Sequence, residues 1–290
     1  MKKILKMKLF LLLSVFISAC EMNSSISDKQ KSSTANVNIK LIHEQGGSLA
    51  ERILAPEGYK RANESAHSFG AFLRNIPLKP HASTVKLYNG SAKGNQSVHA
   101  AVLDITVGPY DLQQCADAVM RLRADYLMHE KRYDDIAFNF TNGFKASYSQ
   151  WRKGKGIQVS NNRCSWINSA QANESAESYS LYLQRVFSYA GSLSLAQQLR
   201  SITNISDIQA GDVWIRGGSP GHAVIVMDVA KNKDGKKIFL IAQSYMPAQD
   251  IHILKNPRNA GMSPWYAVDE IDADFATPEY TFDRSELRRW

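Results

Sequence analysis

The clearest hydrophobic pattern in the chain predicts a helix over residues 112–131. Apolar side chains recur there at helical spacing, at Cys115, Val119, Leu122 and Tyr126. Asp111, just before this run, is a residue type that commonly caps the N-terminus of a helix. We therefore expect a buried stripe along one helix face, with Cys115 in the first turn.

Apolar runs separated by turn residues predict strands in the second half of the chain. Residues 213–215, 222–230 and 237–245 are rich in Val, Ile and Leu, and Asp234-Gly235 is a typical hairpin turn. A turn centred there would pair residue 226 with about residue 243. Allowing for a bulge or a slip, we expect Gln243 within a few residues of His222 across the hairpin.

The remaining pattern indicates shorter elements. Further helices are predicted over 65–74, 179–189 and 194–200, and further strands over 53–59, 84–88, 98–107 and 136–140, with a polar loop over 161–178. No linker is evident between residues 40 and 263, so we expect one α+β domain over residues 40–290. The segment from Pro264 holds seven acidic residues and three arginines. This acidic tail is expected to pack late or to lie on the surface.

The first twenty residues have the organisation of an export signal. Four lysines precede an apolar run over residues 9–17 that is too short to span a bilayer. Ile17-Ser18-Ala19-Cys20 ends this run and resembles the cleavage and lipidation site of bacterial lipoproteins. The resemblance implies a signal peptide over residues 1–19. It also implies a membrane anchor on Cys20, through acyl chains such as palmitate, in the cell envelope, with the outer membrane favoured over the inner one.

Residues 20–39 are rich in Ser, Asn and Lys, and we expect them to form a disordered tether. The net charge of the whole chain is +8, with a pI near 9.3, which would suit a nucleic-acid partner. Half of this charge lies in the predicted signal peptide, leaving +4 on residues 20–290. Because an envelope protein does not meet cytosolic nucleic acid, we expect no nucleic-acid partner.

Three residues have the placement that nucleophilic catalysis needs. A helix N-terminus lowers the pKa of a thiol, which favours Cys115 as a nucleophile. His222 begins a strand directly after a Gly-rich loop, and the amide of Gln243 on the neighbouring strand could orient its imidazole. Each residue also has a structural alternative. Cys115 could be a small buried hydrophobe or could form a disulfide with Cys164, while His222 and Gln243 could satisfy the turn and the hairpin.

Metal and cofactor motifs are missing from the sequence. Neither a His-Glu-x-x-His motif nor paired cysteines occur, and Gly217-Gly218 lacks the spacing of a phosphate-binding loop. We therefore expect no cofactor and no metal. The one set left open is a His-only site formed by His99, His222 and His252.

Two strand motifs resemble those of papain-like cysteine peptidases. Gly221-His222-Ala223-Val224, followed by Ile241-Ala242-Gln243-Ser244-Tyr245, is similar to their His strand and Asn strand. It is also similar to the His strand of the NlpC/P60 and CHAP-type enzymes of bacterial cell walls. The resemblance implies a papain-like fold, with a central antiparallel sheet and a helix that bears the nucleophile. Cys115 would be the nucleophile, His222 the base and Gln243 its orienter, with Gln113 or Gln114 donating to an oxyanion.

The chain after the signal also resembles a bacterial lipoprotein family catalogued as domain of unknown function 4846. The resemblance rests on residues 111–118, 138–144 and 242–249, and it implies an envelope location without an established activity.

Two functions follow as hypotheses. The first is a lipid-anchored cysteine hydrolase, a peptidase or amidase that acts on peptide or amide bonds of the cell wall. The second is a non-catalytic envelope module that binds glycan or protein through a basic aromatic face. Residues 145–163 carry five cations and no acidic residue, together with Tyr148, Trp151 and Arg152, which would contact such a ligand.

Overall fold

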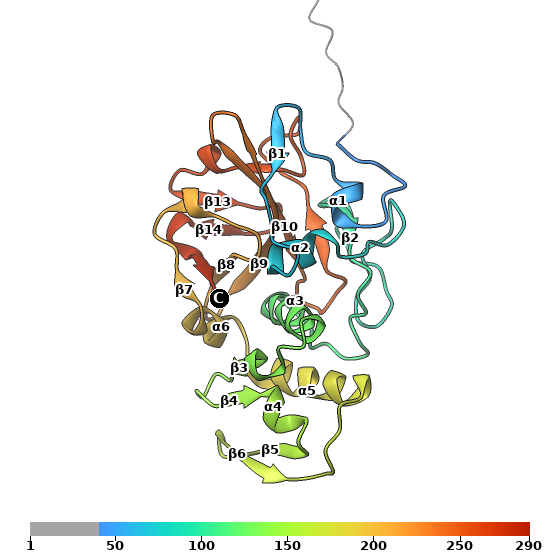
Figure 1. The fold of residues 1–290 in the computed structure, drawn as a ribbon, viewed down its shortest axis with the longest axis vertical. Helices are drawn as coiled ribbons and strands as arrows, with labels where there is room; N and C mark the ends of the chain where they lie inside the picture. The colour runs from blue at the N-terminus through green and yellow to red at the C-terminus, as the bar shows by residue number, and fades with distance from the viewer. Residues whose placement is uncertain (1–40) are drawn as a thin grey trace, which may run out of the picture. The chain divides into compact units, whose positions relative to one another are not determined.

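A nine-stranded sheet organises residues 41–290, the part of the chain that our computed structural model describes (Figure 1). The strands follow the order β2-β11-β10-β9-β8-β15-β7, with β1 paired with β9 and β12 with β10, and all these pairs are antiparallel. The strand bounds are β1 Tyr59–Arg61, β2 His99–Val102, β7 Arg200–Ser201, β8 Val213–Arg216, β9 His222–Asn232, β10 Lys237–Gln243, β11 His252–Leu254, β12 Tyr266–Ala267 and β15 Leu287–Arg289. A mixed α and β chain with a large antiparallel sheet is therefore confirmed. The predicted signal peptide, the anchor at Cys20 and the tether lie outside the described residues.

Helices and three small hairpins complete the fold. The helices are α1 Leu49–Arg52, α2 Phe69–Arg74, α3 Cys115–His129, α4 Tyr148–Trp151, α5 Ala176–Tyr189 and α6 Ser192–Gln198. The hairpins pair β3 Ala137–Asn139 with β4 Lys145–Ser147, β5 Lys155–Ser160 with β6 Arg163–Asn168, and β13 Asp274–Ala276 with β14 Thr281–Asp283. The prediction of a loop over 161–178 is wrong, because this segment contains β6 and the start of α5. No helix within residues 41–290 has the length and hydropathy needed to cross a membrane.

Helix α3 carries the predicted buried stripe, but it begins later than expected. Cys115, Val119, Leu122 and Tyr126 are all buried. The first helical residue is Cys115, since Asp111 is engaged elsewhere: its carboxylate accepts the backbone N–H of Ala248 at 2.6 Å. The helix start is therefore set by a contact between two loops that are far apart in sequence, and this contact ties the approach to Cys115 to the loop after β10.

The hairpin of β9 and β10 forms the centre of the sheet and separates two hydrophobic clusters. Ala223, Ile225 and Met227 belong to the cluster that includes α3, while Val224 and Val226 belong to the cluster that includes Phe275 and Phe282. Val226 pairs with Ile241 rather than with residue 243. The strands leave the turn one residue away from the expected register, with Leu240 opposite Asp228, and a bulge between Leu240 and Ile241 adds a second residue. The shift is within the slip that the sequence analysis allowed.

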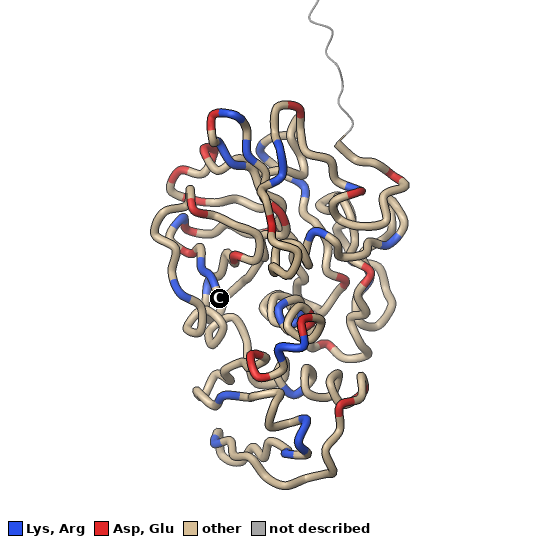
Figure 2. Tube along the Cα trace, in the orientation of Figure 1, with Lys and Arg blue, Asp and Glu red and all other residues tan. Residues whose placement is uncertain are grey.

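The acidic segment from Pro264 is part of the core, so of the two alternatives expected for it, late packing or a surface position, the surface position is wrong. Trp265, Phe282 and Leu287 are fully buried, and β15 pairs with both β8 and β7. Its acidic side chains find basic partners elsewhere in the chain, in the pairs Glu279–Lys93, Glu286–Arg216, Asp269–Lys236 and Asp274–Arg258. Accordingly, red and blue segments alternate around the main sheet in Figure 2. The charge difference between body and tail is thus largely matched by ion pairs.

Candidate active site

His222 and Gln243 meet at one end of the two central strands. His222 is the first residue of β9 and Gln243 is the last residue of β10, and both are buried. Nε2 of His222 lies 2.9 Å from Oε1 of Gln243. Because an amide oxygen only accepts hydrogen bonds, Nε2 carries the proton and Nδ1 holds the free lone pair. The predicted proximity of these two residues is therefore what the structure shows.

Aromatic side chains enclose the His222 imidazole. The ring centroids of Tyr245, Tyr280 and Phe282 lie 4.7, 4.9 and 5.8 Å from that of His222. Burial lowers the pKa of His222 to about 4, since the surroundings offer little solvation to an imidazolium. The imidazole is consequently neutral at neutral pH and is able to accept a proton on Nδ1.

Cys115 lies at the start of α3, beside the first residues of β9. The backbone N–H of Ala223, the residue after His222, favours the charged form of its sulfur, as do the N–H groups of Cys115 and Ala116. The thiol is nevertheless only 8% exposed, and burial raises its pKa to about 11. After burial, the nearby carboxyl of Asp117 is the next largest influence that raises the pKa of Cys115, and burial raises the pKa of Asp117 itself. The helix N-terminus does not give the low thiol pKa expected from the sequence, because desolvation is the larger effect.

Cys115 and His222 share neighbours but are not joined by a hydrogen bond within residues 41–290. Tyr245, whose ring contacts that of His222, has a pKa raised by burial and, to a lesser degree, by the charges of Glu279 and Cys115. Nδ1 of His222 has no hydrogen-bond partner in the described part of the chain. The arrangement is therefore a neutral thiol and a neutral imidazole in one neighbourhood. Catalytic hydrogen bonds of this kind often tighten only when substrate binds.

The two glutamines that were candidates for oxyanion binding differ in their contacts. Gln114 is the N-cap of α3, and its side-chain Nε2 donates to Asp111. Gln113 is buried; its Oε1 accepts from Arg121, while its Nε2 has no partner within the described residues. Of the two, Gln113 thus holds an unused amide donor close to Cys115 in sequence.

Both cysteines of the described region are free thiols, so the alternative of a Cys115–Cys164 disulfide is not formed. Cys164 lies on β6 in the small β5–β6 hairpin, where Nδ2 of Asn142 approaches its sulfur to 3.1 Å. It is partly exposed, whereas Cys115 is buried in α3. This difference makes the two thiols distinguishable by chemical modification.

We expect iodoacetamide to modify Cys164 faster than Cys115 at neutral pH. The reagent attacks the thiolate, and burial keeps Cys115 protonated until the pH approaches about 11. Peptide mass spectrometry of the alkylated protein between pH 7 and 10 measures both rates, with unfolded protein as the reference for equal access. Faster labelling of Cys115 at neutral pH would show that its thiolate is stabilised after all.

The aromatic residues proposed for ligand binding pack inward. Tyr148 is 2% exposed, and the indole N–H of Trp151 donates to Ser178. Arg152 stacks 4.2 Å over the ring of Tyr133 and pairs with Glu174. All three side chains are therefore held by contacts within the protein. Tyr148 is too buried to form part of a binding face.

A His-only metal site is not formed either. Nε2 of His222 donates to Gln243, Nδ1 of His252 donates to the carbonyl of Asp250 at 2.8 Å, and Nε2 of His99 donates to that of Ser83 at 3.0 Å. Among the residues that the structure describes, no group of three or more His, Cys, Asp or Glu is arranged to hold a metal ion.

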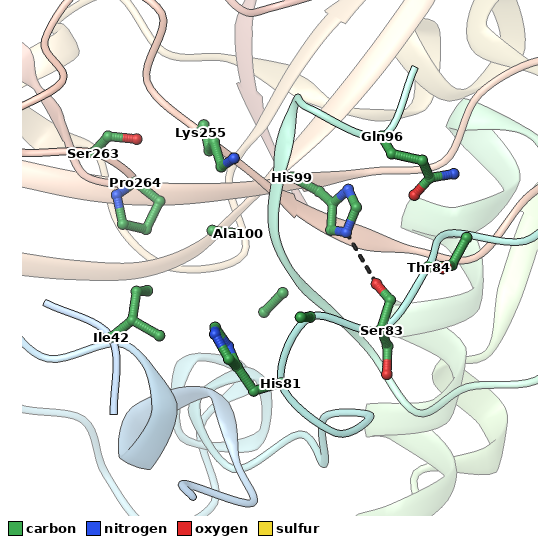
Figure 3. A pocket seen from close by; sticks show the side chains of 12 residues that line it. Ile42, His81, Ser83, Thr84, Gln96, His99, Ala100, Lys255, Ser263 and Pro264 are labelled. Atoms are coloured by element: carbon green, nitrogen blue, oxygen red, sulfur yellow. Dashed lines mark hydrogen bonds between the residues drawn. The ribbon is translucent and has the colours of Figure 1, made fainter. Parts of the chain in front are cut away.

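One hollow of the structure lies away from the Cys115–His222 neighbourhood. Its volume is about 370 Å³, and His81, Ser83, His99 and Lys255 are among the residues that line it (Figure 3). It borders β2, and β11 separates that strand from Gln243 on β10. A smaller hollow of about 140 Å³ is lined by residues 106–110, Leu112, Gln113 and α5 residues, next to the loop that precedes Cys115. We place the candidate site at Cys115 and His222 rather than at a hollow, because the volume of a hollow does not by itself provide a nucleophile and a base.

Sequence reasoning missed Glu279 and Lys93, which lie behind Gln243, and placed His252 only in a possible metal site. Nε2 of Gln243 donates to Glu279 at 2.8 Å and approaches Nε2 of His252 at 3.4 Å, and Glu279 pairs with the buried Lys93. These residues come from four separate segments and form no local motif. An acidic residue within an apolar, aromatic stretch at 275–282 was the only signal available in the sequence.

The chain is thus a mixed α and β protein in which a buried Cys, His and Gln lie near one end of the main sheet. Comparison with protein families then identifies the chain as a member of the family described as Domain of unknown function (4846), which matches residues 49–289. No curated protein and no solved structure gave a match.

Proposed function

We propose that this protein is a cysteine hydrolase, anchored to a membrane of the cell envelope through lipidated Cys20, that cleaves peptide or amide bonds of cell-wall material. The observation that carries the proposal is the hydrogen bond from Nε2 of His222 to Gln243, which leaves Nδ1 free beside the strand position that Cys115 contacts. An orienting amide behind a histidine is the arrangement that papain-like hydrolases use, and we propose that the fold is related to theirs. The location in the envelope rests on residues 1–20 of the sequence.

In the proposed reaction, the Cys115 thiol attacks the carbonyl carbon of the scissile amide while Nδ1 of His222 takes the thiol proton. The new C–S bond pushes the carbonyl electrons onto oxygen. Collapse of this intermediate breaks the C–N bond, and His222 returns its proton to the leaving amine. Water then attacks the thioester, with His222 again acting as the base, and a carboxylic acid and the free thiol result. Because the thiol and imidazole begin neutral, proton transfer accompanies the attack rather than preceding it.

The surface around the site offers apolar contacts to a substrate. Tyr110 and Met246 are 56% and 58% exposed, the two highest values among the exposed large hydrophobic residues of the described region. Tyr110 lies on the loop before Cys115 and Met246 on the loop after Gln243. The hydrogen bond from the backbone N–H of Ala248 to the carboxylate of Asp111 joins these two loops. We propose that they form the walls that hold the acyl part of the substrate over Cys115.

Incubation of the purified protein with soluble peptidoglycan fragments tests the function. We expect new amino groups and new carboxylates in equal number, and in H₂¹⁸O each new carboxylate should contain one heavy oxygen. Liquid chromatography with mass spectrometry measures both and shows which bond is cut. If no fragment is cleaved across the pH range in which the fold is stable, the hydrolase proposal fails.

A further inference from the structure

The side-chain amide of Gln243 is held in one orientation by a carboxylate that no catalytic motif requires. Oε2 of Glu279 accepts a hydrogen bond from Nε2 of Gln243 at 2.8 Å, on the side of the amide away from His222. Glu279 is only 18% exposed in its side chain, and its other oxygen contacts the ammonium of Lys93, which is 8% exposed. A carboxylate and an ammonium are thus placed side by side behind the residue that orients the imidazole.

The orientation of this amide decides which nitrogen of His222 carries the proton. An amide that presents its oxygen to Nε2 requires a proton there, whereas an amide that presents its NH₂ group requires a lone pair there and moves the proton to Nδ1. Only the first form leaves Nδ1 able to accept the thiol proton. A carboxylate behind Gln243 accepts hydrogen bonds but cannot donate them, so it excludes the second form.

Lys93 holds the carboxylate of Glu279 in place behind Gln243. Its ammonium has donors only and also reaches the carbonyl of Asn95 at 3.2 Å. It therefore keeps one carboxylate oxygen of Glu279 turned toward itself, while the other oxygen accepts from Gln243. His252 adds a weaker contribution, because its Nδ1 donates to Asp250 and its Nε2 is left as an acceptor for Gln243 at 3.4 Å.

We propose that Glu279, held by Lys93, is a positioning residue that fixes the proton of His222 on Nε2 and so reserves Nδ1 as the base. Its kinetic consequence rests on the proposed hydrolase function. Its effect on the His222 tautomer does not, since the tautomer is set by hydrogen bonds in the free protein.

The test is the tautomer of His222, read from the ¹⁵N shifts of the imidazole nitrogens in ¹⁵N-histidine-labelled protein. The signal is assigned by its loss in His222→Gln. In the wild type we expect the Nε2–H form. In Glu279→Gln, the ammonium of Lys93 can only donate hydrogen bonds, so it faces the oxygen of the new amide. The NH₂ group of the new amide then faces Gln243, and the side-chain amide of Gln243 rotates so that its oxygen accepts this hydrogen bond. We expect His222 to change to the Nδ1–H form.

Glu279→Gln leaves a buried ammonium without its partner and can fail to fold, so a second pair of variants removes that charge. In Lys93→Met/Glu279→Gln, the amide at position 279 is free to offer its oxygen to Gln243, and we expect the Nε2–H form to be retained. In Lys93→Met/Glu279→Leu the carboxylate acceptor is gone and only the more distant Nε2 of His252 remains, so we expect both tautomers to be populated. A purely structural role of residue 279 would not distinguish these two proteins of equal charge.

The same variants report on catalysis. We expect kcat for peptidoglycan fragments to fall at least about tenfold in Lys93→Met/Glu279→Leu with KM unchanged, and to be largely restored in Lys93→Met/Glu279→Gln. An Nδ1–H form in the wild type, or the same tautomer in both double variants, overturns the inference. If the tautomers change as expected while the wild type hydrolyses nothing, the positioning role stands and the proposed function falls.

Discussion

Replacing Cys115 with alanine will lower the rate of fragment hydrolysis by at least about 1,000-fold. The proposed mechanism forms its covalent intermediate on this sulfur, and removal of a nucleophile leaves only the small acceleration due to substrate binding and charge stabilisation. The loss should appear in kcat rather than in KM, because Cys115 is buried and contributes little surface to a bound substrate. The measurement is the steady-state rate of amine release, followed by mass spectrometry.

Cys164→Ala is the matched control for this prediction. It removes the other free thiol of the described region, on β6 of the β5–β6 hairpin, and we expect unchanged kcat and KM. Thermal unfolding of both variants, compared with the wild type, separates lost chemistry from lost structure. Full activity in a folded Cys115→Ala protein would exclude the mechanism, and equal losses in both variants would point to a general effect of thiol removal.

Replacing Asp228 with asparagine will lower the free energy of unfolding by about 3 kcal/mol, since it leaves two arginines near the core without their counter-charge. Asp228 lies on β9 and is fully buried. Its Oδ2 accepts from Nε of Arg61 at 2.5 Å, and its Oδ1 accepts from Nη2 of Arg74 at 2.6 Å. The two arginines come from β1 and α2, so this carboxylate fixes both elements to the central strand. Urea denaturation followed by tryptophan fluorescence measures the change.

Asp135→Asn is the control for the loss of an ion pair as such. Asp135 pairs with Arg132 three residues away, and both side chains are about half exposed. Exposed pairs contribute little because water already solvates both charges. We expect no measurable change in unfolding for this variant. A similar small effect of Asp228→Asn would mean that water replaces the carboxylate, and that Arg61 and Arg74 do not depend on it.

The elements that follow from local pattern were predictable. The stripe from Cys115 to Tyr126 gives α3 because helical spacing is a property of the sequence alone, and the Asp234-Gly235 turn gives the β9–β10 hairpin for the same reason. The proximity of Gln243 to His222 followed from this hairpin, since a tight turn fixes the register to within a residue or two. The bulge at Leu240 was not predictable from the turn.

The predictions that failed concern features set by contacts between distant segments or by burial. The carboxylate of Asp111 accepts a hydrogen bond from the backbone N–H of Ala248 instead of capping α3, and no local sequence pattern predicts this contact. The thiol pKa of Cys115 was expected to be low from its helix position, but it is set by desolvation under β9. The segment after Pro264 was judged by its net charge, although its large apolar residues fill the second cluster and its acids meet bases from the rest of the chain.

The place of β15 in the sheet has a consequence for how the chain is made. Residues 287–289 lie between β8 and β7, so β8 has one unpaired edge until these residues are available. A chain that emerges from a ribosome or a translocation channel N-terminus first therefore keeps this strand edge open until residues 287–289 have emerged. Such an edge readily pairs with other chains, so we expect the emergence of residues 287–289, rather than the earlier strands, to start productive folding.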